Sequence, residues 1–342
     1  MLSEARTTVA PQQDDPTWQL LTVDDRDYVS MENIRKFYKF TDLRRSGPAA
    51  ALAVKKMALK VEADSREIWI NNVKFISSFP VLEQGGELWI SRMDLVKLIH
   101  PVLNPSANKN ATDVKTVVLD AAHGGDEPGR LSGAGPEKDF TLDLVKRTRS
   151  LLEAAGFSVV LTRETDRTIP VAERVRMANQ AENAVLISVN FSSGNSGIET
   201  RALPPMGVPS TGHLPAESDM NPLAGNSCDA GNAALAAAVH ASIVWKVRLY
   251  NRGIRRTRLE LLNGLTIPGI VVSCGALDNA YDARDIARPE YRQLVAERLA
   301  EGVKNYQRAM ARRPQNPEPA EATRPDAPVQ PESIPADDKE SE

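Results

Sequence analysis

Several features that would place a protein in a specialised class are scarce or missing from this sequence. Its only two cysteines, Cys228 and Cys274, cannot form a disulfide framework. No apolar run is long enough to span a bilayer, and the first residues lack the charged and apolar regions of a secretory signal. A net charge of -3 gives no case for a nucleic-acid partner. We therefore expect a protein without a transmembrane segment, and a cytoplasmic location is not excluded.

What is present indicates a folded chain of about two domains. Hydrophobic residues make up 42% of the 342 residues, which is ordinary for a protein with a packed core. Composition changes along the chain predict a small domain, a linker and a larger domain between two disordered polar tails, the second rich in proline and acidic residues. The predicted segments are a tail at 1–16, a small domain at 17–103, a linker at 104–114, a larger domain at 115–310 and a tail at 311–342.

The small domain contains a repeat. The residues YVS at 28–30 recur as WIS at 89–91, so that in each copy a strand ends and a serine begins a helix. This α+β pattern resembles the N-terminal-like domain of copper amine oxidases, which also occurs beside bacterial cell-wall enzymes. The only histidine of this region, His100, precedes a proline and is expected to be structural. We expect a packing or protein-binding module without chemistry of its own.

The larger domain alternates between apolar strands and amphipathic helices. This order predicts an α/β fold, a three-layer αβα domain with a mostly parallel sheet, preceded by the small α+β domain. The segment 204–230 is rich in Pro, Gly, Ser and Asn and interrupts the alternation, as a lid, a binding loop or a disordered segment would. Strands are predicted at 116–119, 157–162, 184–191, 197–203, 256–262 and 269–274, and helices at 141–155, 170–180, 232–250 and 289–310.

One stretch of the larger domain has the residues of a metal site. An apolar strand leads into a turn with His123 at its tip, a glycine-rich loop follows, and Glu137 stands at the start of a helix. Zinc sites in enzymes use three protein ligands, commonly His and Glu, and leave a fourth position open. A strand-end His with a Glu at the next helix start supplies part of such a site.

The region around these residues is similar to the zinc-dependent N-acetylmuramoyl-L-alanine amidases of the type-3 family. The resemblance implies one zinc held by a strand-end His, a Glu before the first helix and a second His, with water as the fourth ligand and a late-strand Glu as general base. Zinc would lower the pKa of that water to about 7. The similar segments are, in order, VVLDAAHGG, PEKDFTLDLVKRTRSLLEAAGFSVVLTRETDRTIPVAERVRMAN, VLISVN, GIETRAL, NRGIRR, IPGIVVSCGALDN and RPEYRQLVAERLAEGV.

Two positions depart from the family pattern. The resemblance maps the first two ligands to His123 and Glu137, but the third-ligand position holds Asn190 instead of His, and the general-base position holds Ser273 instead of Glu. An amide oxygen is a poor zinc ligand, and a serine hydroxyl without a neighbouring base takes no proton near neutral pH. We therefore predict a catalytically degenerate amidase-like peptidoglycan protein, a pseudoenzyme in which zinc is weakly bound or absent.

Two alternatives stay open. In the first, the protein is an active zinc amidase in which His213, or an acid of the 204–230 loop, replaces the lost ligand. In the second, it is a non-catalytic scaffold whose N-terminal domain captures a protein partner. The resemblance implies a periplasmic or cell-envelope location, with peptidoglycan or its stem peptide as the ligand.

Other polar residues have simpler interpretations. His240 is expected at the surface or partly packed on its helix, His213 in a solvated loop, and Glu199 exposed on a strand. The arginines between 252 and 258 are expected along a solvated strand edge, where they could contact peptide carboxylates of a cell-wall substrate. Cys274, within an apolar strand, is expected to be an inert buried thiol.

Overall fold

The structure is a computed structural model that describes residues 6–9, 18–108, 113–192 and 196–312. Arg6–Val9 forms β1, which pairs antiparallel with β2 (Gln19–Val23), so this part of the predicted first tail is a strand. The rest of that predicted tail, most of the predicted second tail and part of the predicted linker lie outside the described residues. No helix among the described residues has the length and apolar character needed to cross a membrane.

The N-terminal unit confirms the repeat seen in the sequence. The two repeated segments lie on β3 (Arg26–Ser30) and β10 (Glu87–Ser91), which pair antiparallel with each other. Each strand ends in a serine whose hydroxyl caps the following helix, α1 (Met31–Phe37) or α2 (Arg92–Asp94), as predicted. The other elements are β4 (Asp42–Ser46), β5 (Ala49–Val54), β6 (Met57–Glu62), β7 (Glu67–Ile70), β8 (Val73–Ile76), β9 (Leu82–Gln84), a π-helical turn (Leu95–Ile99) and α3 (His100–Leu103).

The larger unit has the predicted α/β order. Its strands run β14-β11-β15-β18-β16-β17, and among these only the β16–β18 pair is antiparallel. The elements are β11 (Thr116–Ala121), α4 (Glu137–Ala154), β14 (Ser158–Leu161), α5 (Val171–Asn179), β15 (Ala184–Ser192), β16 (Ile198–Ala202), α6 (Asp229–Val244), β17 (Asn251–Arg256), α7 (Glu260–Asn263), β18 (Gly269–Ala276), α8 (Ala280–Ala287) and α9 (Pro289–Met310), with a short β12 (Leu131–Ser132) and β13 (Gly135–Pro136) hairpin before α4.

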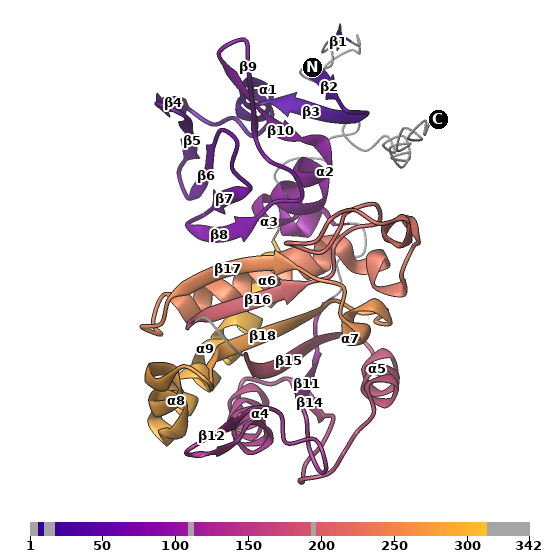
Figure 1. The fold of residues 1–342 in the computed structure, drawn as a ribbon, viewed down its shortest axis with the longest axis vertical. Coiled ribbons are helices and arrows are strands. Elements are labelled where there is room, and N and C mark those ends of the chain that lie inside the picture. Colours follow the sequence, from indigo (N-terminus) through magenta and orange to yellow (C-terminus); the bar gives the residue numbers. More distant parts are fainter. Residues whose placement is uncertain (1–5, 10–17, 109–112, 193–195, 313–342) are drawn as a thin grey trace, which may run out of the picture.

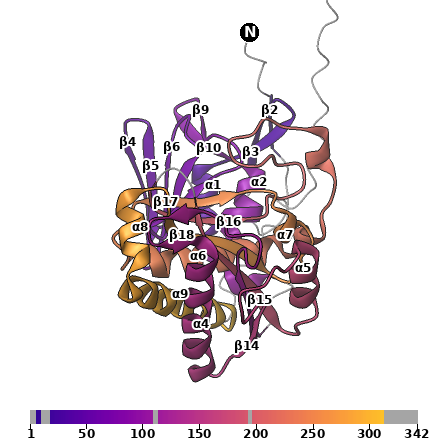
Figure 2. The same ribbon diagram turned by 60° about the horizontal axis from the view of Figure 1, so that its bottom comes forward.

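Helices cover both faces of this sheet, which confirms the fold class (Figures 1 and 2). The helices α4, α6 and α9 pack on one face over the main apolar core, and α5 and α7 pack on the other over a smaller one. The central strand β15 is buried on both sides, as its continuous apolar run predicts. Both faces of the sheet are therefore covered by helices. This leaves the ends of the strands as the place where functional groups collect.

The two units share one sheet. Strand β8 pairs parallel with β17 at Phe75 and Ile254, so that eleven described strands from β14 to β4 form a continuous sheet. Figure 1 shows β8 and β17 meeting at the junction of the units. A buried guanidinium also connects the two units, because Arg256 donates to the Lys97 carbonyl at 2.6 Å. The predicted limits of the two domains stay predictions, and the junction between them is a strand pair.

Some predicted bounds of elements are wrong, and one helix is missing from the predictions. The strand expected at 256–262 ends at Arg256, and α7 follows, because the consecutive Leu261 and Leu262 are both buried and a strand would send them to opposite faces. The helix expected from 141 begins at Glu137. Helix α8 was not predicted. The 204–230 loop contains short 3-10 turns. Arg258 anchors it through an ion pair with Asp219 at 2.8 Å.

Candidate functional site

The candidate site lies where β11, β15 and β18 end. These strands are parallel, so their carboxyl ends meet at one edge of the sheet, the usual place for ligand sites in such folds. His123 stands two residues beyond β11 with φ of 64°, a left-handed conformation that is uncommon for a non-glycine residue. This conformation sets the direction in which the imidazole leaves the turn.

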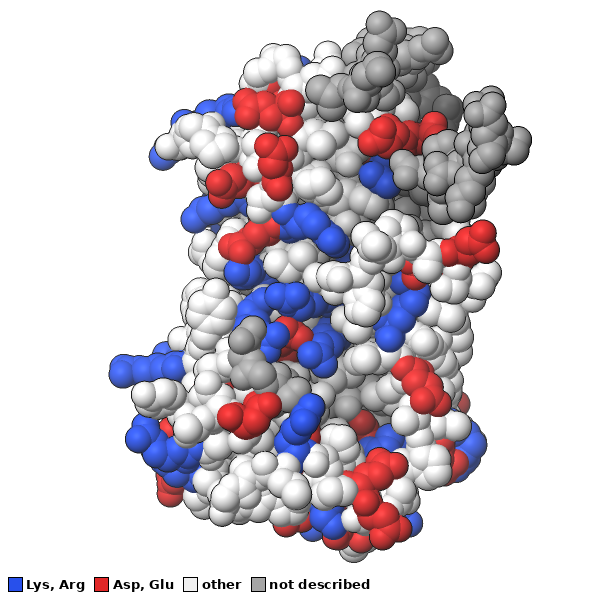
Figure 3. Space-filling model, viewed as in Figure 1, with Lys and Arg blue, Asp and Glu red and all other residues white. Residues whose placement is uncertain are grey.

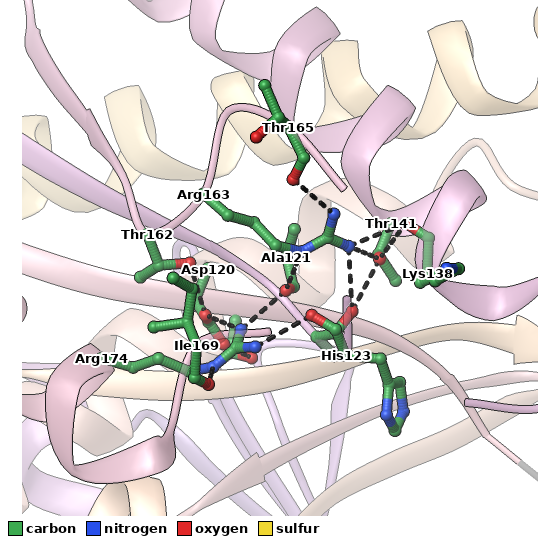
Figure 4. Close-up of polar contacts among 12 residues, drawn as sticks. Asp120, Ala121, His123, Lys138, Thr141, Thr162, Arg163, Thr165, Ile169 and Arg174 are labelled. Atoms are coloured by element: carbon green, nitrogen blue, oxygen red, sulfur yellow. Dashed lines mark hydrogen bonds and ion pairs between the residues drawn. The ribbon is translucent and has the colours of Figure 1, made fainter. Parts of the chain in front are cut away.

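Two buried arginines hold the turn (Figure 4). Arg174 of α5 donates to the carboxylate of Asp120 at 2.6 Å and to the carbonyls of Ala121 and His123 at 2.7 and 2.9 Å. Arg163 donates to the Ala121 carbonyl at 3.1 Å and to groups at the start of α4. Figure 4 shows the His123 ring pointing away from this network. The arginines thus fix the backbone and leave the imidazole available.

His123 and Glu137 are brought together as the sequence indicated. The His123 Nε2 lies 3.2 Å from Glu137 Oε2, and the Glu137 side chain is only 3% exposed. The Glu137 oxygens accept from the backbone N–H of Arg130 at 2.9 Å and of Phe191 at 2.8 Å. The hydrogen bond to Glu137 raises the pKa of His123. Gly129 closes over the pair, since a side-chain carbon there would lie 2.6 Å from the imidazole.

Asn190 and Ser273 face each other on the neighbouring strands. They are register partners on β15 and β18, and the Ser273 hydroxyl donates to the Asn190 amide oxygen at 2.5 Å. Glu137 reaches the backbone next to Asn190 through its bond to Phe191, so both pairs belong to one site. The Ser273 hydroxyl and the Asn190 amide oxygen are therefore donor and acceptor to each other.

Glu199 lies beside Ser273 on the next strand, β16, and the sequence-based prediction of its environment is wrong. It is the antiparallel partner of Ser273 and is only 2% exposed, whereas an exposed position was predicted. Three arginines from β16 and β17 surround it and compensate its burial. Its carboxylate lies 2.7 Å from Arg201, 3.0 Å from Arg252 and 3.1 Å from Arg255.

These three arginines are called here the arginine cluster. Glu199 neutralises one of their three positive charges, which leaves a surplus of two. In Figure 3, Lys and Arg side chains gather at mid-height around an acidic centre, over the region of β16 and β17 in Figure 1. The prediction of a solvated strand edge is wrong, because β17 lies between β16 and β8. The cluster gives the site a local positive potential although the whole chain carries -3.

In the part of the chain that the structure describes, no third metal donor of the usual kind joins His123 and Glu137. Within the described residues, no three or more His, Cys, Asp or Glu side chains are grouped to hold a metal ion. His213, the predicted substitute, is exposed on its loop. Cys274 is buried with a pKa raised by desolvation to about 12, as expected of an inert thiol. The donors present do not fit a three-ligand zinc site.

His240 is fully buried, whereas a position at the surface or partly packed on its helix was predicted. Its side chain is fully enclosed beneath the sheet, bonded to Thr200 at 3.0 Å and to Asn251 at 2.8 Å. Burial lowers the pKa of His240 to about 4. The many alanines of α6 allow the helix to approach the sheet closely, so that even its polar residues become covered.

We expect His240 to make the fold sensitive to acid. The folded state keeps this imidazole neutral while the unfolded chain protonates it below about pH 6.5, so its contribution is complete above that pH and is lost as the pH falls towards 4. The loss at pH 4.5 is about 2–3 kcal/mol. Urea unfolding at pH 7 and pH 4.5 measures how much the free energy of unfolding falls between these pH values. The fall should be smaller by that amount in His240→Gln than in the native protein. An identical loss in both proteins would contradict the assignment.

Comparison with known proteins places the larger unit in a known family. The family model for N-acetylmuramoyl-L-alanine amidase matches residues 117–305, more than half of the chain. The α/β fold and this match together show that the chain belongs to the N-acetylmuramoyl-L-alanine amidase family. The resemblance of the N-terminal unit to another domain stays a prediction.

Individual relatives are distant. The uncharacterized protein YqiI of Bacillus subtilis is 24% identical over 195 residues, which cover 56% of this chain and 84% of that protein. The probable cell wall amidase LytH of Staphylococcus saprophyticus is 27% identical over 214 residues, covering 60% and 65%. The endolysin of Bacillus phage SPP1 is 28% identical over 196 residues, covering 55% and 65%. The chain thus spans just under two thirds of the length of the last two.

Solved structures of amidases align with the same part of the chain. The N-acetylmuramoyl-L-alanine amidase from Clostridium difficile 630 has 26% identity and a TM-score of 0.47, covering 57% of this chain and 97% of that one. The amidase AmiC2 of Nostoc punctiforme has 27% identity and the same TM-score of 0.47, covering 57% and 98%.

Proposed function

We propose that this protein is a catalytically degenerate amidase of the cell envelope, which binds the peptide stem of peptidoglycan without cleaving it. The observation that carries the proposal is the hydrogen bond between Ser273 and Asn190. These residues hold the positions that the amidase resemblance assigns to the general base and the third zinc ligand. A hydroxyl and an amide that bond to each other supply neither a base nor a strong donor for zinc.

The charge of the neighbouring strand supports binding of an anion in place of a cation. The arginine cluster flanks Ser273 through Glu199, and its two surplus positive charges oppose a divalent ion at this edge of the sheet. Guanidinium groups favour carboxylates, which they bind in a two-pronged geometry. The carboxylates of a stem peptide are therefore the ligand groups that best match this surface.

Peptide binding tests the proposal. Titration of the full chain with an N-acetylmuramoyl stem peptide should show binding without release of the free peptide. Arg255→Gln should weaken binding by about tenfold, since a hydrogen bond between charged groups contributes about 1.5–3 kcal/mol. Arg255 is suitable because Arg201 and Arg252 still neutralise the buried Glu199.

Matched controls identify the cause of any loss. Arg176→Gln removes an exposed arginine from α5 and should leave binding unchanged. A stem peptide whose carboxylates are converted to amides should bind the native chain as weakly as the acid form binds Arg255→Gln. Absence of binding to the native chain would refute the proposal, and peptide release with one bound zinc would favour an active amidase.

A further inference from the structure

A groove lies between the N-terminal unit and helices α6 and α9. Its volume is about 760 Å³, within the range of ligand sites in proteins, about 300–1,000 Å³. Thr200 bonds to His240 of α6 whereas its neighbour Glu199 meets the arginine cluster, so the groove helices and the cluster lie on opposite faces of the sheet. The groove therefore has no part in the chemistry of the candidate site.

The groove has an apolar lining and a basic rim. Among the described residues, no acidic side chain lines it, and the five charged side chains that do are all basic and exposed. Such a surface fits a ligand with both aliphatic and acidic groups. The apolar lining includes Val54, Met57, Ile70, Val73, Ala237 and Ala241, and the rim consists of Lys39, Lys55, Lys56, Arg308 and Arg312.

The chain itself continues from the rim of the groove into a segment that has both aliphatic and acidic residues. Arg312 lines the groove, and residues 313–342 follow it with eight Asp and Glu against three Lys and Arg. Seven prolines in the segment disfavour helix and central strand, and favour the extended form in which proline-rich segments bind grooves. Its large aliphatic residues are Val329 and Ile334, and four of its eight acidic residues follow Ile334.

We propose that residues 313–342 bind in this groove of their own chain, with aliphatic side chains against the lining and carboxylates against the basic rim. The attachment at Arg312 favours this occupant, because a tethered segment has an effective concentration of about millimolar, well above that of a separate partner. Ile334 lies 22 positions beyond Arg312 and, with the chain extended, at most about 70–80 Å from it. The bound segment would hold the N-terminal unit against α6 and α9.

Hydrogen exchange of the full chain tests the proposal without a binding partner. Amides of residues 54–57 and 305–312, which border the groove, should exchange about tenfold more slowly in the full chain than in a chain that ends at Arg312. The full chain with Asp337→Asn, Asp338→Asn and Glu340→Gln should exchange nearly as fast as the shortened chain. This variant changes no described residue, so it tests the charges even if the shortened chain folds poorly.

A peptide of residues 313–342 provides the second arm. It should bind the shortened chain and bind the full chain at least about tenfold more weakly, because the tethered segment competes. Lys55→Ala with Lys56→Ala should weaken peptide binding, whereas Lys146→Ala, an exposed lysine of α4, should not. Equal exchange at the groove in the full and shortened chains would overturn the proposal. So would a concentration-dependent dimer that protects the groove without the segment.

Discussion

Replacing Asn190 by His and Ser273 by Glu in the same chain is expected to create zinc-dependent amidase activity. His123 and Glu137 already lie 3.2 Å apart, so the new imidazole would supply a third donor from the adjacent strand. Zinc affinity should rise by at least about 100-fold, because groups that only support a ligand already change it by about 10–100-fold. Isothermal titration with zinc and release of stem peptide from purified peptidoglycan measure the two gains.

The intermediate variants separate the two functions. Asn190→His alone should gain zinc affinity without hydrolysis, because no carboxylate takes the proton of the bound water. Asn190→His with Ser273→Gln is the closest control, since it has the size of the active variant but no base. Because Ser273 is almost fully buried, thermal unfolding of each variant should accompany the assay. Hydrolysis by the glutamine control would contradict the role given to position 273.

Arg174→Met is expected to destabilise the protein by about 3–5 kcal/mol. Arg174 is 5% exposed, and its removal leaves the buried Asp120 without its ion pair and the His123 carbonyl without its donor. The unpaired carboxylate is the main cost, because a buried charge is expensive without a partner. Urea unfolding monitored by circular dichroism measures the loss.

Arg176→Met on the same helix is the matched control. Arg176 is exposed and pairs with Glu173 at 2.5 Å, and exposed ion pairs contribute about 0–1 kcal/mol. Adding Asp120→Asn to Arg174→Met should restore part of the lost stability, because it removes the stranded charge. A loss below about 1 kcal/mol for Arg174→Met would show that the network does not support the His123 turn.

Local patterns were enough to predict the elements that deliver His123 and Glu137. Each stands next to a strand or helix whose apolar period is clear within a few residues, and the serine caps at Ser30 and Ser91 depend on similarly short-range signals. The resemblance to the amidases then connected segments that are far apart in sequence. The mostly parallel order of the larger sheet followed from the alternation of strands and helices.

The errors concern residues whose environment comes from distant segments. Glu199 looks exposed in its own strand because the arginines that cover it from β17 follow more than fifty residues later. His240 looks exposed because an alanine-rich helix shows little periodicity, although close packing against Thr200 buries it. The pairing of β8 with β17 joins two units that sequence patterns treat separately. Long-range contacts of this kind leave no local signal.

Zinc binding by the native chain tests the central claim most directly. The full chain, first stripped of metal and then titrated with zinc at pH 7, should retain much less than one zinc per chain after gel filtration and release no stem peptide from peptidoglycan. One retained zinc per chain with release of the peptide would contradict the claim that Asn190 and Ser273 have replaced the groups needed for hydrolysis.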